Sequence, residues 1–476
     1  MKTQEILIKL FESKVNEKVD KIVHLPLSGS DRKYFRITSK TISLIGVYNL
    51  DKKENIAFLT FTKHFFDKGL NVPKIFAENL DNNIYLLQDL GNTTLFAFLS
   101  EEKNKNVFTI DLLESYKKVL KELPKFQILA GKDLDYSVCY PRSSFDKQSM
   151  LWDLSYFKYY FLKLAQIPFD EQLLEDDFET FTNFLLKAEG NYFLYRDFQS
   201  RNIMLQNEQA YFIDYQGGRK GALQYDLASL LYDAKAAIPQ DDRNKLLNYY
   251  LNILENYIEV DKKEFIEYYY GYVLIRIMQA MGAYGFRGFY ERKEHFLASI
   301  PYAIENLSWI LDNIEFAVEL PTLMKVLRKL PQSKRLKQLE AEKKQIKLTV
   351  EVNSFSYKRG IPVDVSENGG GFVFDCRALH NPGRYDEYKQ LTGKDKKVID
   401  FLKKEKEADE FLNNILKIIE QSINKYQKRN FKNLMVNFGC TGGQHRSVYC
   451  AEKLAEYLRK NFDVNVNLRH REQEFM

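Results

Sequence analysis

The spacing of apolar and polar residues divides the chain into three stretches. In the first ninety residues, short β-rich runs around one helical pattern predict strands over 34–37, 41–47 and 84–88 and a helix over 55–68. From residue 94 to about 320, apolar residues recur every three or four positions, which predicts a helical body with helices over 112–123, 151–164, 178–186 and 265–286. Two strand-like runs, 193–195 and 210–213, interrupt this body around a polar loop.

The last stretch alternates strand and helix patterns. It predicts strands over 347–356, 372–375 and 433–438 and helices over 395–426 and 446–461. Such alternation is typical of a small α/β domain with a parallel strand pair. Residues 321–345 before it carry eight Lys and Arg against two acidic residues, so we expect a basic linker there.

Composition restricts the class of protein. With 476 residues, of which 45% are hydrophobic, the chain can build more than one core and is not disordered. No run approaches the ~18 uncharged apolar residues of a membrane helix, so no membrane association is expected. Glu5 and Glu12 interrupt the apolar residues of segment 1–15, which favours an amphipathic helix over a secretory signal.

Cysteine usage and charge give two further expectations. Four cysteines without a C-x-x-C pair are typical of a protein of the reducing cytoplasm. Residues 321–476 carry 31 Lys and Arg against 20 Asp and Glu, whereas residues 1–320 carry 39 against 45. This surplus in the last third would suit a phosphorylated or nucleic-acid partner, although charge alone favours an ordinary solvated surface.

One polar constellation in the body is typical of phosphoryl transfer. Asp197 and Asn202 lie five residues apart on the polar loop, and Asp214 follows the next strand-like run. Phosphoryl transfer needs a carboxylate that accepts the proton of the attacking hydroxyl, and oxygen ligands for the magnesium that bridges the nucleotide phosphates. The spacing therefore predicts Asp197 as base and Asn202 and Asp214 as metal ligands, with capping of loop turns as the alternative.

Two neighbouring features have ordinary and functional interpretations. Residues 27–36 predict a turn between two strands, which is either a plain hairpin or a loop that presents backbone N–H groups to phosphates. Asp226 opens an apolar helical run, so it is either a helix N-cap or a brace for the loop that carries Asp197.

These motifs resemble the aminoglycoside phosphotransferase and choline kinase superfamily over residues 20–315. Within it, the segments 196–204, 213–216 and 282–287 look most like the bacterial N-acetylmuramate/N-acetylglucosamine anomeric kinases, which act in cell-wall recycling. The resemblance implies an α+β bilobal protein-kinase-like fold, with an N-lobe over 1–90 and a helical C-lobe over 91–320. It also implies ATP and Mg²⁺ as cofactors, and nucleotide contacts by residues of the turn and of the hinge 86–91: Ser28, Gly29, Ser30, Arg32, Gln88 and Asp89.

The sequence departs from this pattern twice. The lysine expected on the third strand is missing, since residues 42–50 contain no Lys. Magnesium, loop amides and Arg32 would then have to neutralise the negative charge of the phosphates. Tyr195 replaces the histidine usual before Arg-Asp.

The acceptor pocket is expected on the predicted helix 151–164, which combines aromatic residues with a carboxylate. Most of its aromatic residues would be core. Because the kinases that the chain resembles carry an acidic residue in this part of the fold, Asp153 is predicted as a sugar contact, with Phe157 beside it.

A second constellation follows the strand 433–438. The glycine-rich segment 439–447 leads into a helix, and such a turn binds anions through backbone amides and the helix dipole. Cys440 and Arg446 also match C-x5-R, the spacing of cysteine phosphatases, so a thiolate nucleophile is a competing hypothesis.

Residues 346–476 resemble, over their whole length, the C-terminal domain of the RNase adapter protein RapZ, giving a small α/β C-terminal domain. That family senses glucosamine 6-phosphate and contributes to small-RNA binding. The resemblance implies a phosphosugar site formed by Asp375, Arg377, Thr441, Gly442, His445 and Arg446. A family histidine after Asn-Pro is Gly383 here, and the nucleotide-binding half of RapZ is replaced by the kinase-like body.

Together these features predict a cytoplasmic, ATP-dependent kinase that phosphorylates a hydroxyl, the anomeric one, of an amino sugar such as N-acetylmuramate or N-acetylglucosamine. Its C-terminal domain would bind a phosphosugar, and RNA binding stays open. The alternative is a RapZ-like regulatory protein that binds RNA or a phosphosugar and has an inactive kinase-like body.

Overall fold

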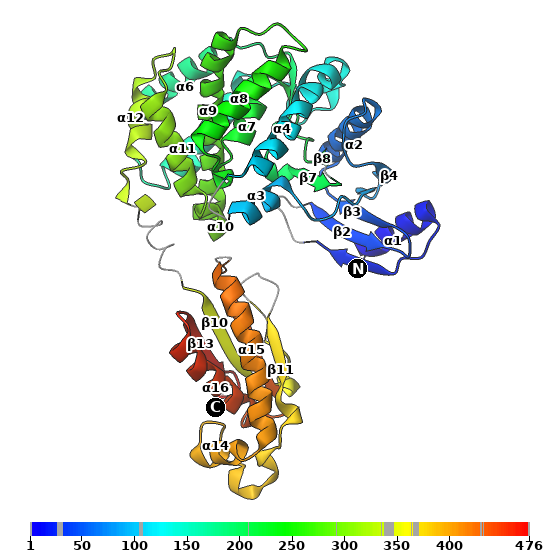
Figure 1. Ribbon diagram of the computed structural model, residues 1–476, viewed down its shortest axis with the longest axis vertical. Helices are drawn as coiled ribbons and strands as arrows, with labels where there is room; N and C mark the ends of the chain where they lie inside the picture. The colour runs from blue at the N-terminus through cyan, green and yellow to red at the C-terminus, as the bar shows by residue number, and fades with distance from the viewer. Residues whose placement is uncertain are drawn as a thin grey trace. The chain divides into compact units, whose positions relative to one another are not determined.

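The chain forms two compact units, Met1–Glu340 and Ala341–Met476, which are described separately (Figure 1). The computed structural model describes residues 2–25, 32–103, 108–207, 209–291, 293–334, 336–337, 347–362, 364, 371–428, 431 and 433–474. In these residues no helix is both long and apolar enough to cross a membrane.

The first unit begins with a helix and a five-stranded antiparallel sheet. Its elements are α1 (Lys2–Val15), β1 (Lys21–His24), β2 (Lys33–Thr38), β3 (Ser43–Tyr48), α2 (Lys52–Asp67), β4 (Ile75–Asn79) and β5 (Ile84–Gln88), with strand order β1-β2-β3-β5-β4. Alternate side chains of β5 face opposite ways: Ile84 and Leu86 pack toward α1, and Tyr85 and Leu87 toward α2. Both faces of the sheet are therefore covered by helices.

A helical body follows, and α9 runs through its centre (Figure 1). Its α-helices are α3 (Leu95–Lys103), α4 (Ile110–Pro124), α5 (Lys147–Phe157), α6 (Glu171–Leu185), α7 (Leu223–Leu231), α8 (Gln240–Leu254), α9 (Lys262–Gly285), α10 (Glu294–Leu297), α11 (Ile300–Asn313) and α12 (Pro321–Lys329). Helix α9 contacts α5, α7 and α11 and buries residues on nearly all sides, as expected for a central helix.

Two antiparallel strand pairs interrupt this body, where the sequence predicts two strand-like runs. They are β6 (Tyr192–Leu194) with β9 (Arg219–Gly221), and β7 (Ile203–Gln206) with β8 (Gln209–Phe212). The loop 195–202 connects one pair to the other, and segment 213–218 connects them again. These two connections carry the residues predicted for phosphoryl transfer.

The basic linker predicted over 321–345 is wrong in its first part, because α12 is packed onto the body. Leu323, Val326 and Leu327 are buried, and the backbone N–H of Leu323 donates to Oδ2 of Asp177 on α6 at 2.7 Å. The lysines and arginines of α12 lie on its solvent side. The segment is therefore an ordinary amphipathic helix, although its basic residues suggest a linker in the sequence. Of the rest of the predicted linker, residues 335 and 338–345 lie outside the described part.

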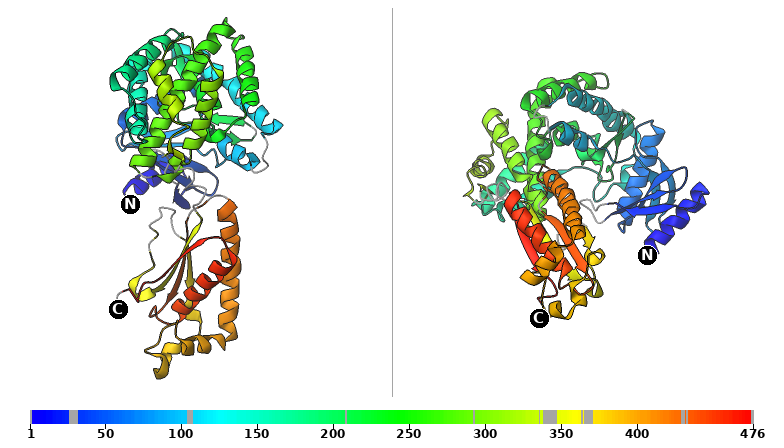
Figure 2. Two further views of the ribbon diagram at one scale, coloured as in Figure 1. Left: turned by 90° about the vertical axis from the view of Figure 1, so that its left-hand side faces the viewer. Right: turned by 60° about the horizontal axis from the view of Figure 1, so that its bottom comes forward.

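The second unit is a small α/β domain with a parallel sheet, as the sequence predicts. The strands are β10 (Thr349–Ser356), β11 (Phe372–Asp375), β12 (Asn433–Cys440) and β13 (Asn465–His470), in the order β11-β12-β10-β13, and all pairs are parallel. Helices α14 (Lys396–Lys403), α15 (Lys406–Lys428) and α16 (Arg446–Asn461) complete it (Figure 2). After β10 the chain continues to β11 at one edge of the sheet, and after β12 it continues to β13 at the other edge. The connections that leave the neighbouring strands β10 and β12 therefore run in opposite directions, so the topological switch point lies between these two strands.

Candidate functional site

The structure brings together the three residues predicted for phosphoryl transfer. Nδ2 of Asn202 donates to the backbone carbonyl of Asp197 at 2.9 Å and to Oδ2 of Asp214 at 3.2 Å. Asn202 ends the loop that begins at Asp197, and Asp214 follows β8 directly. The amide side chain therefore ties the loop to the second carboxylate, and the charge of Asp197 acts on Asp214.

The backbone is strained at both ends of this arrangement. Arg196 has φ +80° and Asp214 has φ +72°, a left-handed conformation that residues with a Cβ adopt at a cost. Asp226 holds the first end, because Oδ2 accepts the N–H of Tyr195 at 2.8 Å and Oδ1 that of Arg196 at 3.0 Å. Tyr195, which replaces the usual histidine, donates its hydroxyl to the Ile213 carbonyl at 2.7 Å.

Asp226 is thus a brace for the loop and not a helix N-cap. Helix α7 starts three residues earlier, with Ala222 at its N-cap position, so Asp226 lies inside the helix. Its carboxylate is fully buried and also accepts from Nε2 of Gln127 at 3.2 Å. Burial raises the pKa of Asp226 to about 7, in spite of these donors.

Asp214 combines a raised pKa with an accessible side chain. Desolvation by the surrounding body raises its pKa first, and the nearby Asp197 carboxylate raises it further. Gln216, which donates to Oδ1 at 2.8 Å, and the charge of Arg32 oppose the rise. The side chain keeps 39% of its surface exposed, so a ligand can reach it.

Arg32 lies beside these carboxylates although it precedes β2. Its Nη2 lies 2.9 Å from Oε1 of Glu54 on α2, and its Nη1 lies 3.8 Å from Oδ1 of Asp214. The residue is only 3% exposed, and its Nε has no hydrogen-bond partner among the described residues. A buried cation is therefore present next to the predicted metal ligands, where the third strand supplies no lysine.

The other predicted nucleotide contacts are placed less directly. Ser28, Gly29 and Ser30 lie outside the described residues. Gln88 ends β5, and its Oε1 accepts the N–H of Lys74 at 3.3 Å. Asp89 binds Arg36 through Nε at 2.7 Å and Nη2 at 2.9 Å.

The carboxylate of Asp89 also accepts from Ser43 and from the N–H of Gly91, at 2.6 and 3.0 Å. Partial burial pushes its pKa up, but the bonds from Arg36, Ser43 and Gly91 leave the pKa below its ordinary value. In the described residues, Asp89 therefore fixes the hinge that follows β5.

The two predicted sugar contacts have different environments. Oδ1 of Asp153 on α5 accepts from Nη2 of Arg196 at 2.7 Å, beside Asp197, while its Oδ2 is buried without a partner among the described residues. Phe157 is fully buried in the main core and stacks on Phe161. The predicted sugar contact of Phe157 is therefore wrong, since core side chains enclose its ring completely.

Glu54 and Gln216 are site residues that sequence reasoning missed. Nε2 of Gln216 bridges Oδ1 of Asp214 and Oε1 of Glu54, at 2.8 and 3.4 Å. Glu54 lies in the first turn of α2, which is an ordinary place for an acidic residue on a helix. Its pairing with Arg32 depends on how α2 packs against the sheet, which local spacing does not reveal.

The donor set fits a nucleotide-bound magnesium ion. Asp214 contributes carboxylate and Asn202 amide oxygen, and Mg²⁺ takes one or two such ligands together with substrate phosphates. Among the described residues no group of three or more His, Cys, Asp or Glu could hold a metal ion alone.

In the second unit, the carboxyl ends of the parallel strands gather the residues predicted to bind a phosphosugar. Ser356 at the end of β10 pairs with Cys440 at the end of β12, and its hydroxyl donates to the Thr441 carbonyl at 2.7 Å. Asp375 at the end of β11 pairs with Gly439. The glycine-rich segment thus lies at the switch point, where ligands of open α/β sheets bind.

The charged residues of this edge are held by local contacts. Arg377 binds Asp375 and lies over the ring of Tyr357, 4.1 Å from its centroid. Nη1 of Arg446 donates to the carbonyls of Arg377 and Leu379, at 3.0 and 2.9 Å. Thr441 and Gly442 are exposed, and open space surrounds the position that a Cβ of Gly442 would take.

His445 and Gly383 are neighbours at the same edge. Nε2 of His445 donates to the Tyr388 carbonyl at 2.8 Å. A Cβ at Gly383 would lie 3.3 Å from Cε1 of His445. The family histidine that Gly383 replaces would therefore stand directly beside His445.

Cys440 is poorly placed for the phosphatase hypothesis. Its Sγ accepts the N–H of Gly443 at 3.2 Å and lies 3.1 Å from Oγ of Ser447. The residue is only 3% exposed and belongs to the core of the second unit. A nucleophile must reach the phosphorus, so the burial favours a structural thiol.

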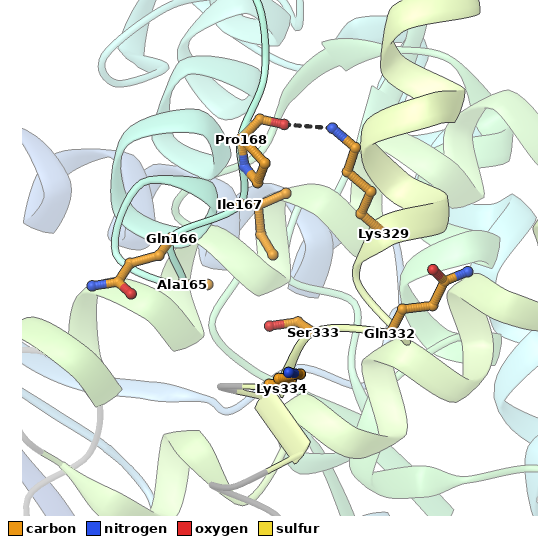
Figure 3. A pocket seen from close by; sticks show the side chains of 8 residues that line it. All are labelled: Ala165, Gln166, Ile167, Pro168, Lys329, Gln332, Ser333 and Lys334. Carbon is orange, nitrogen blue, oxygen red and sulfur yellow. Dashed lines mark hydrogen bonds between the residues drawn. The ribbon is translucent and has the colours of Figure 1, made fainter.

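A cavity of about 530 Å³ lies elsewhere in the first unit (Figure 3). Residues 165–168 line one side and residues 329–334 the other, and Nζ of Lys329 donates to the Pro168 carbonyl at 2.8 Å. None of the predicted site residues lines it.

Comparisons with known proteins agree with the two-unit division. Residues 24–261, half of the chain, match the model of the phosphotransferase enzyme family, and residues 348–474 match the RapZ C-terminal domain. A nucleotide-binding protein of Fervidobacterium nodosum is 41% identical over 133 residues, which are 28% of this chain and 45% of that protein. One of Thermotoga neapolitana is 39% identical over 127 residues, 27% of this chain and 43% of that protein. The chain spans less than half the length of these curated relatives.

Two similar solved structures are choline kinases. Choline kinase LicA from Streptococcus pneumoniae is 13% identical, with a TM-score of 0.43 over 65% of this chain and 99% of that one. The choline kinase from Cryptosporidium parvum is 11% identical, with a TM-score of 0.45 over 68% of this chain and 99% of that one.

Proposed function

Since this chain belongs to the phosphotransferase enzyme family, we propose that its first unit transfers the γ-phosphoryl group of ATP to a hydroxyl of an amino sugar. A single observation carries this proposal: Asn202 links the backbone of Asp197 to the carboxylate of Asp214, whose pKa the charge of Asp197 raises, and the buried Arg32 lies beside Asp214. A base, two oxygen ligands and a cation are the parts that phosphoryl transfer requires.

Each residue has a defined part in this mechanism. The Asp197 carboxylate orients the acceptor hydroxyl and takes its proton as the oxygen attacks the γ-phosphorus. Asn202 and Asp214 hold Mg²⁺, which supplies charge neutralisation at the phosphates when bound. Arg32, kept in place by Glu54, contributes a fixed positive charge on the phosphate side. Asp226 keeps the loop of Asp197 in its strained conformation.

The charges near Asp197 support a sugar as acceptor. Asp153, the carboxylate on the acceptor side, is already neutralised by Arg196, so it offers no free charge to a cation such as choline. It still offers acceptor atoms to sugar hydroxyls. N-acetylmuramate and N-acetylglucosamine are the proposed acceptors, with phosphorylation at the anomeric hydroxyl in cell-wall recycling, because segments 196–204, 213–216 and 282–287 resemble the kinases of that branch.

For the second unit we propose phosphosugar binding at the glycine-rich segment. The observation that favours it is the position of Thr441 and Gly442, exposed at the switch point of a parallel sheet with Arg446 and His445 adjacent. In a cytoplasmic protein this site would report the level of a phosphorylated sugar to the kinase. RNA binding by the basic surface is a separate hypothesis.

One experiment tests the proposed activity. The protein is incubated with Mg²⁺, ATP and a panel of amino sugars with choline as contrast, and products are identified by phosphorus NMR, which separates anomeric from C6 esters. A sugar phosphate is the expected product. ATP left intact with every acceptor, while a fragment of residues 347–474 still binds glucosamine 6-phosphate, would instead establish the alternative of a regulatory protein with an inactive body.

A further inference from the structure

Four aromatic side chains gather on the surface of the helical body. Tyr156 and Tyr160 have ring centroids 4.8 Å apart, and Phe286 lies 4.9 Å from Tyr160 and 5.4 Å from Tyr290. Three of the four are partly exposed, and Tyr290 is 68% exposed. We call these four residues the aromatic platform.

The platform is built by two unusual helical turns that pack against each other. Residues Lys158–Leu162 and Phe286–Tyr290 both form π-helical turns, which are rare and often occur at functional sites. Glycine is required at their contact, because a Cβ at Gly285 would lie 2.0 Å from the Tyr160 carbonyl oxygen. The sequence thus maintains a costly local geometry that presents these rings.

The platform is continuous with the candidate active site. Asp153, Tyr156 and Tyr160 are spaced three and four residues apart on α5 and the turn that follows, so they share one helix face. Asp153 binds Arg196, the neighbour of Asp197. Seven residues of helix are about 10 Å long, so the platform extends about two sugar-ring widths away from Asp153.

From this geometry we propose that the aromatic platform binds a sugar ring of the acceptor next to the ring that is phosphorylated, so that the preferred acceptor is a disaccharide or a larger saccharide. This rests on the phosphoryl transfer proposed above. Sugar rings have apolar C–H faces that pack on aromatic rings, and large aromatic side chains dominate such contacts.

The same rings are unsuited to a quaternary ammonium ion. The rings contact one another at centroid distances of 4.8 to 5.4 Å, which leaves no room for an ammonium ion between them. Arg287, which lies 5.9 Å from the centroid of the Phe286 ring, pairs with Glu291 at 3.0 Å, so the Glu291 carboxylate is already engaged by a cation.

Binding of N-acetylglucosamine and of its disaccharide N,N′-diacetylchitobiose to the full-length protein tests the proposal, with dissociation constants measured by saturation-transfer NMR in the absence of ATP. Tyr290→Ala and Phe286→Leu should weaken the disaccharide roughly five- to tenfold and the monosaccharide little. Tyr159→Ala is the matched control, because Tyr159 is an exposed aromatic residue next to Tyr160, 46% exposed, that packs on Lys158 and Lys163 outside the platform.

Three results overturn the platform: unchanged disaccharide affinity in both variants, an equal loss in Tyr159→Ala, or no sugar binding by the unaltered protein. The readout separates the two proposals. If the platform variants lose disaccharide affinity and no sugar is phosphorylated by the unaltered protein, the platform stands and the proposed kinase activity fails. If sugars are phosphorylated and the variants bind as the unaltered protein does, only the platform fails.

Discussion

Nη2 of Arg32 lies 2.9 Å from Oε1 of Glu54, and together they place a buried positive charge beside Asp214. Kinase-like folds generally pair a lysine of the third strand with a glutamate of the following helix. Here β3 contains no lysine, α2 contains Glu54, and the cation comes from the residue just before β2. The cation of this ion pair thus comes from the residue before β2 and not from β3.

Replacing Arg32 should therefore damage transfer more than folding. We expect Arg32→Ala to lower kcat about 10²- to 10³-fold, the usual effect of removing a preorganised charge from a reaction centre. Arg32→Lys should recover only part of the loss, because an ammonium group lacks the planar fork of the guanidinium. Lys33→Ala is the control, because Lys33 is an exposed neighbour. Steady-state kinetics with the acceptor that the protein phosphorylates gives the measurement. Unchanged kcat in Arg32→Ala would contradict the assignment.

Asp226 should make stability depend on pH. Its pKa is about 7 in the folded protein and 3.8 for an ordinary Asp, so between these values the folded state holds a proton that the unfolded chain has released. Its contribution to stability is therefore lost as pH rises from about 4 to 7. Relative to Asp226→Asn, the free energy of unfolding should fall by at most about 1.4 kcal/mol per pH unit in this window. Urea unfolding of both proteins at pH 5, 6, 7 and 8 measures this difference in the free energy of unfolding. The same pH dependence of that free energy in the two proteins would refute the prediction.

Asp89 should act through Arg36 and not through the nucleotide. The Arg36 guanidinium occupies both carboxylate oxygens, so Asp89→Ala and Arg36→Ala should each raise the KM for ATP slightly, and the double variant should add little. A double-mutant cycle on the KM for ATP measures the coupling. If Asp89→Ala raises KM as strongly in the Arg36→Ala background as in the unaltered protein, Asp89 contacts the nucleotide itself.

Cys440 distinguishes binding from phosphatase chemistry in the second unit. Its buried thiol leads us to expect no phosphate release from glucosamine 6-phosphate, and unchanged ligand affinity in Cys440→Ser. Gly442→Val, by contrast, should weaken binding at least tenfold, because its branched side chain would fill the open space above the segment. Calorimetric titration and a phosphate-release assay provide the two readouts. Phosphate release that disappears in Cys440→Ser would establish the phosphatase hypothesis instead.

The sequence contained enough information for the main elements and for the phosphoryl-transfer constellation. Helix α2, strands β3 and β5 and the parallel second sheet follow from strong apolar periodicity, and they form as predicted. Strands β1, β4 and β13 were missed because all three are at sheet edges, where partly exposed residues blur the alternation.

Three other features depended on tertiary structure. The Arg32–Glu54 pair joins residues 22 apart on different elements, so no local pattern indicates it. In α12 the apolar spacing of Leu323, Val326 and Leu327 was visible, but the surrounding lysines and arginines favoured a linker. Phe157 was expected beside Asp153 in the sugar site, and only the packing of α5 against α9 shows that Phe157 faces the core.

The most direct test of the central claim is the kcat of Asp197→Asn with Mg²⁺, ATP and the best amino-sugar acceptor, measured together with the affinity for ATP. The carboxylate is proposed as the base, so kcat should fall by roughly 10²- to 10⁴-fold while ATP affinity stays nearly intact. Undiminished turnover in this variant would contradict the assignment of Asp197 and with it the proposed mechanism.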